Sequence, residues 1–129
     1  MDKPKAKILV VEDDPDEAQM MEMALRLHGY QVALAADGQQ GIANVMAQRP
    51  DLIILDVMMP VLDGFAMCSR LHRDPDFSDI PVILVTGIAK RISETTYSVD
   101  DFLRGEADDY LEKPITPAEL IETVERWVR

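Results

Sequence analysis

The chain of 129 residues has one cysteine, Cys68, so it cannot form an internal disulfide. We expect Cys68 to be a small buried apolar residue and the chain to work in a reducing, cytoplasmic setting. Aromatic residues make up only 5%, so the core must be aliphatic side chains and methionine. No apolar run approaches the roughly 20 residues of a membrane span, and no signal peptide is visible.

Basic residues are also scarce. Thirteen lysines and arginines face 24 acidic residues, which gives a formal net charge of −11. This balance argues against direct binding to nucleic acid and against docking on an anionic membrane. Two uses of the excess acid remain open: it keeps the domain soluble, and some carboxylates gather to hold a cation.

Short apolar runs alternate with stretches of helical periodicity along the whole chain. The predicted strands are 7–11, 30–35, 52–56, 81–86 and 109–111. The predicted helices are 15–28, 38–49, 64–72, 93–103 and 117–128. This alternation predicts a single α/β domain over 1–129, with no output domain: a doubly wound, five-stranded parallel sheet covered by five helices.

Turn and cap residues punctuate this pattern. Gly29 is a signal for the end of the first helix, and Thr116 with Pro117 and Glu119 predicts a capped start for the last one. Two helix faces are expected to be apolar, one formed by Gly41, Ile42, Val45 and Met46 and the other by Leu120, Ile121, Val124, Trp127 and Val128.

Polar residues stand where the predicted strands end. Glu12, Asp13 and Asp14 follow the first strand, Asp56 ends the third, Thr86 ends the fourth, and Lys113 follows the fifth. In a parallel sheet these ends meet at one edge, where ligands bind. Clustered carboxylates suit Mg²⁺, and lysine and hydroxyl groups suit phosphoryl oxygens. We therefore expect phosphoryl transfer to a nucleophilic carboxylate, with Asp56 the best candidate.

The chain resembles the receiver domain of two-component response regulators over essentially its whole length. The matching stretches are 8–14, 50–60 with Asp63-Gly64, 81–86 and 107–114. The resemblance implies a flavodoxin-like fold with strand order 2-1-3-4-5. It also implies a phosphoryl group passed from a histidine kinase or phosphotransfer protein, and a downstream protein or output domain that responds.

The resemblance assigns a role to each site residue. Asp56 is the phosphoacceptor, Glu12 and Asp13 are the acidic pair, and Asp13 and Asp56 bind Mg²⁺ directly. The backbone carbonyl of Met58 is the third protein ligand of Mg²⁺. Lys113 contacts the phosphoryl group, while Thr86 and Tyr110 form the conformational switch. Self-phosphorylation and self-dephosphorylation that depend on Mg²⁺ are expected, without enzymatic turnover of another substrate.

One departure and three other readings accompany this prediction. The segment 88–101 is longer than in typical receivers, which points to a distinct partner surface. A phosphatase that uses a nucleophilic Asp would need a second acid where Met58 stands. A flavin or nucleotide module lacks its glycine-rich loop after the first strand. An interaction domain that is never phosphorylated leaves the acid, hydroxyl and lysine set unexplained.

Overall fold

The computed structural model describes residues 6–56, 64–86 and 108–128. Its strands and helices are β1 (Lys7–Val11), α1 (Pro15–Leu27), β2 (Gln31–Ala35), α2 (Gly38–Ala47), β3 (Leu52–Asp56), α3 (Gly64–Arg73), β4 (Val82–Thr86), β5 (Asp109–Glu112) and α5 (Pro117–Trp127). The predicted helix at 93–103 and the long segment 88–101 lie outside the described residues.

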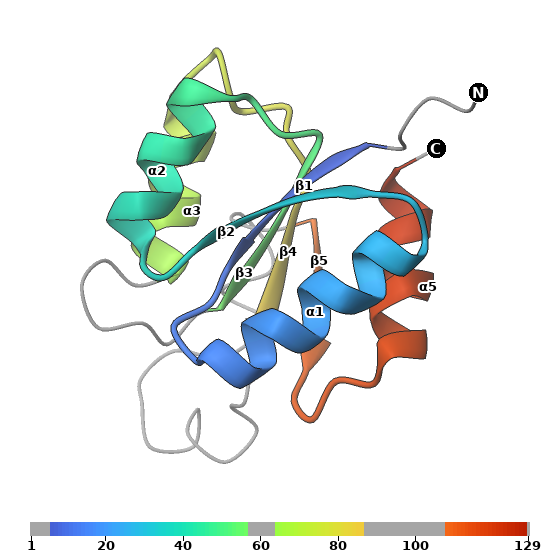
Figure 1. The fold of residues 1–129 in the computed structure, drawn as a ribbon. Helices are drawn as coiled ribbons and strands as arrows, with labels where there is room; N and C mark the ends of the chain where they lie inside the picture. Colours follow the sequence, from blue (N-terminus) through green and yellow to red (C-terminus); the bar gives the residue numbers. More distant parts are fainter. Residues whose placement is uncertain (1–5, 57–63, 87–107, 129) are drawn as a thin grey trace.

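All five strands are parallel and form one sheet in the order β2-β1-β3-β4-β5. The doubly wound α/β prediction is therefore confirmed. Helices α1 and α5 cover one face of the sheet, and α2 and α3 cover the other (Figure 1). No helix in the described ranges is long and apolar enough to cross a membrane.

Alternating residues of the inner strands supply two cores, one on each face of the sheet. Toward α1 and α5 point Ile8, Val10, Leu52, Ile54, Ile83 and Val85. Toward α2 and α3 point Leu9, Val11, Ile53, Leu55, Val82 and Leu84. Cys68 of α3 lies fully buried in the second core, as expected from the sequence. Burial on both faces explains why these strands are continuous apolar runs.

Caps fix where the helices begin and end. The Asp14 carboxylate accepts from the N–H of Asp16 at 2.9 Å and starts α1, with Pro15 in its first turn. The Thr116 hydroxyl accepts from the N–H of Glu119 at 3.1 Å and starts α5, as predicted. Gly29 follows α1 with φ of 90°, a left-handed conformation that favours glycine after a helix.

Two residues assigned from the sequence to apolar helix faces, Met46 and Trp127, are not buried. Met46 is 66% exposed, because at about 100° per residue it lies about 90° from the centre of the stripe formed by Gly41, Ile42 and Val45. Trp127 is 40% exposed, and its indole N–H donates to Asp109 Oδ2 at 2.9 Å. The indole needs a polar partner, so the Trp127 ring lies beside Asp109, the first residue of β5, and not inside the core.

Candidate functional site

The parallel sheet gathers the acidic strand ends at its carboxyl edge. Asp56 is the last residue of β3, and Glu12 directly follows β1. The two strands pair with Val11 opposite Leu55, so Glu12 and Asp56 are neighbours across the ladder. Lys113 follows β5 at the same edge. The fold therefore brings four of the predicted site residues, Asp13 included, into one place.

Three carboxylates form the centre of the site. Glu12, Asp13 and Asp56 each place one oxygen within 4.8 Å of the others. Glu12 and Asp56 are almost fully buried, at 3% and 5% exposure, whereas Asp13 is exposed. The cluster thus has two acids fixed in the protein and one that faces solvent. A set of hard oxygen donors open to water on one side suits Mg²⁺.

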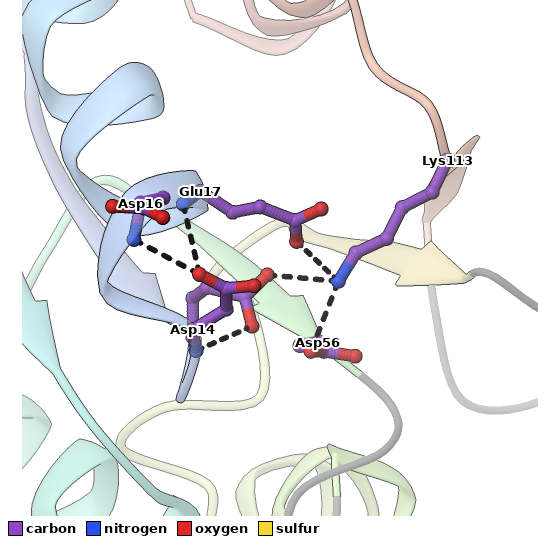
Figure 2. Close-up of polar contacts among 6 residues, drawn as sticks. Asp14, Asp16, Glu17, Asp56 and Lys113 are labelled. Atoms are coloured by element: carbon purple, nitrogen blue, oxygen red, sulfur yellow. Dashed lines mark hydrogen bonds and ion pairs between the residues drawn. The ribbon is translucent and has the colours of Figure 1, made fainter.

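Lys113 supplies the positive charge of the site. Its Nζ lies 3.0 Å from Glu12 Oε1 and 3.3 Å from Asp56 Oδ2, and it also contacts Glu17 Oε2 (Figure 2). Among the described residues, only the contact with Asp56 has hydrogen-bond geometry; Glu12 Oε1 and Glu17 Oε2 lie close to the ammonium without it. One ammonium among these carboxylates leaves the site with excess negative charge, which a divalent cation would offset.

The pKa values follow from this crowding. Burial, together with the neighbouring Asp56 carboxylate, raises the pKa of Glu12 to about 9, so Glu12 carries a proton at neutral pH when no cation is bound. Burial alone would lower the pKa of Lys113, but the carboxylates of Glu17, Glu12 and Asp56 reverse this and raise it. The ammonium is therefore charged throughout the physiological range.

The remaining predicted site residues are less fully described. Thr86 is the last residue of β4 and pairs with Glu112 of β5, but its side chain lies outside the described part, as does the whole of Met58. Tyr110 pairs with Leu84 on β4, and its side chain is 45% exposed.

Glu17 is the site residue that the sequence reasoning missed. It lies in the first turn of α1, where an acid is ordinarily explained by the helix dipole. The available signal was position: a helix that follows a strand directly begins at the carboxyl edge of the sheet. A long acidic side chain in that first turn can reach back to the strand ends.

Comparison with known proteins gives a consistent result. The family model of the response regulator receiver domain matches residues 8–125. The DNA-binding dual master transcriptional regulator RpaA of Synechocystis sp. is 37% identical over 126 residues, which are 95% of this chain and 49% of RpaA. The chain spans about half the length of the curated relatives it matches.

Solved structures agree in fold. A putative response regulator from Chloroflexus aurantiacus is 34% identical, with a TM-score of 0.83 and coverage of 96% of this chain and 97% of that one. The receiver domain of a sensor histidine kinase from Pseudomonas aeruginosa, with a magnesium ion in its active site cleft, is also 34% identical, with a TM-score of 0.83 and coverage of 97% and 98%.

The family match covers nearly all of the chain, and the sheet order and acidic edge agree with it. The chain belongs to the response regulator receiver domain family, the signalling domains of two-component systems.

Proposed function

We propose that this domain accepts a phosphoryl group on Asp56 from a phosphohistidine of a histidine kinase or phosphotransfer protein, and that its conformation changes as a result. The observation that carries the proposal is the convergence of Asp56, two further carboxylates and Lys113 at one sheet edge. A buried carboxylate beside an ammonium is placed to act as a nucleophile toward an anionic phosphoryl group.

The transfer itself makes one bond and breaks one. A carboxylate oxygen of Asp56 attacks phosphorus, and the phosphorus–nitrogen bond of the phosphohistidine breaks, with its electron pair left on the imidazole nitrogen. The product on Asp56 is an acyl phosphate. Lys113, 3.3 Å from Asp56 Oδ2, is within reach of an oxygen of the incoming group and would donate to it.

Glu12, Asp13 and Asp56 fit a resident Mg²⁺, because their oxygens are close together and the charge of Lys113 does not balance theirs. Asp13 and Asp56 would bind the ion directly, with the carbonyl of Met58 as a further ligand. Bound there, Mg²⁺ would offset the charge of the phosphoryl oxygens during transfer. The same chemistry would support self-phosphorylation by small donors and self-dephosphorylation by water.

The switch is proposed to run through Thr86 and Tyr110. Phosphorylation would draw the Thr86 hydroxyl toward Asp56, and the Tyr110 ring would turn inward from its half-exposed position. A downstream protein or output domain would respond to that change. We also propose that the domain is cytoplasmic. It would make no direct contact with nucleic acid or with an anionic membrane, because its net charge of −11 would be repelled by both.

Intact-mass analysis after incubation with acetyl phosphate and Mg²⁺ tests the proposal. The wild type should gain the mass of one phosphoryl group, and Asp56→Asn should gain none. Asp14→Asn is the matched control, because Asp14 caps α1 in the same region and asparagine caps equally well. Labelling of Asp56→Asn at the wild-type rate would place the acceptor elsewhere, and an unlabelled wild type would favour a pure interaction domain.

A further inference from the structure

Glu17 does not act as its position in α1 would suggest. Asp14 is the N-cap and Glu17 stands three residues later, the spacing at which a glutamate commonly accepts from the N-cap N–H. Here the Asp14 N–H donates instead to Glu12 Oε2 at 3.3 Å. The Glu17 side chain extends past the cap and contacts the Lys113 ammonium (Figure 2). Asp14 remains the N-cap, but Glu12 accepts its N–H in place of Glu17, so the Glu17 side chain is available for the lysine.

The three carboxylates around Lys113 differ in how much solvent they see. The side chains of Glu12 and Asp56 are 0% and 6% exposed, whereas that of Glu17 is 37% exposed. An ammonium has three N–H donors, and three carboxyl groups already crowd around it as ion-pair partners, although only the contact with Asp56 has hydrogen-bond geometry among the described residues. A phosphoryl oxygen on Asp56 would be a fourth. Glu17 is the partner that can leave at least cost, because its side chain is the most exposed of the three and water can take the place of the lysine at Oε2, which is covered while the contact lasts.

We infer that Glu17 is a positioning residue that competes with the incoming phosphoryl group for Lys113. The inference rests on the proposed function of Asp56 as acceptor. In the resting domain Glu17 holds the ammonium toward α1, and this contact must be given up before Lys113 can donate fully to the phosphoryl group. Glu17 therefore slows phosphorylation by small donors and keeps the resting state from reacting too readily.

Two substitutions separate the contact from the charge. Glu17→Gln removes the charge, and Glu17→Asp keeps it but shortens the side chain so that it falls short of Lys113. Asp16→Asn is the control, because it removes one charge from the same exposed helix turn, where the Asp16 side chain has no contact with the lysine among the described residues. Circular dichroism confirms that each variant folds.

The readout is the second-order rate constant for labelling by phosphoramidate with Mg²⁺. In this reaction Asp56 attacks phosphorus, the phosphorus–nitrogen bond breaks, and ammonia leaves with the electron pair. Both Glu17 variants should react about two- to fivefold faster than wild type, the range for one partly exposed ion pair, and Asp16→Asn should not. The NMR signal of the Lys113 ammonium should move in both Glu17 variants. In a Lys113→Met background, Glu17→Gln should change nothing.

Each possible result either supports or overturns the inference about Glu17. Wild-type rates in both Glu17 variants, or a gain that persists without Lys113, would overturn the inference while Asp56 remains the acceptor. A gain in Glu17→Gln alone would show that only net charge matters and would overturn it too. If the wild type takes no label, the proposed function fails first, and the inference with it. Faster labelling in both variants that depends on Lys113 would support it.

Discussion

Replacement of Lys113 by methionine should expose the electrostatic cost of the acidic cluster. Methionine keeps the length and apolar part of the side chain but removes the ammonium that lies 3.0 Å from Glu12 and 3.3 Å from Asp56. The buried Asp56 carboxylate and the Glu12 carboxyl group beside it would then have no ammonium next to them. Without metal ions we expect the variant to fold with reduced stability, because Glu12 can stay protonated but cannot replace the ammonium.

The expected loss of stability in Lys113→Met follows from how deeply the interactions of Lys113 are buried. Removal of one partner from a fully buried ion pair costs about 3–5 kcal/mol. The Lys113 side chain is 23% exposed, so water already screens part of its interactions. We expect a loss of about 2 kcal/mol. With an unfolding entropy of about 2.1 cal/mol/K per residue, a chain of 129 residues should lose about 7 °C in Tm.

Thermal unfolding with and without Mg²⁺ measures this directly, with Lys7→Met as the control, since Lys7 contacts Gln48 outside the cluster. Because Mg²⁺ would supply positive charge to the same carboxylates, saturating Mg²⁺ should shrink the difference between wild type and Lys113→Met to about half or less. The reasoning is refuted if the difference is unchanged in Mg²⁺, or if Lys7→Met shows the same loss.

Two further predictions concern the carboxylates themselves. Without metal, the free energy of unfolding of the wild type should fall as pH rises from about 5 toward about 9, because folded Glu12 keeps a proton that the unfolded chain has lost. Urea unfolding of Glu12→Gln over the same pH range should show a weaker dependence on pH. Parallel profiles for the two proteins would contradict the assigned protonation of Glu12. Asp13→Asn should weaken Mg²⁺ binding by at least about tenfold in calorimetric titration, and an unchanged affinity would remove Asp13 from the ligand set.

Much of the fold could be predicted because its central strands are simple. β1 and β3 are buried on both faces, so apart from Lys7 at the start of β1 and Asp56 at the end of β3 both appear in the sequence as apolar runs. Once the strands are parallel, their carboxyl ends must share an edge. The meeting of Glu12, Asp56 and Lys113 was therefore predictable from chain topology alone, before any side-chain geometry was known.

The contacts of Glu17 and Trp127 could not be predicted, because they depend on which of several possible polar partners each side chain binds. Glu17 could have capped its own helix or reached the lysine, and the spacing of residues in the sequence is the same in both cases. Trp127 matched the apolar stripe of α5, but its N–H found an acceptor in Asp109, 18 residues away in the sequence. Periodicity predicts which face a residue is on, but it does not predict which of several polar partners a side chain selects.

The hydrogen bond from Asp14 to Glu12 joins the acidic site to the frame of the molecule. Glu12 accepts the N–H of the residue that caps the start of α1, and it also belongs to the cluster that would receive a cation. Any reorientation of Glu12 must therefore be accompanied by a change in the electronic surroundings of the Asp14 amide. A change in occupancy of the site would therefore be detectable at the Asp14 amide, the peptide group at the start of the helix.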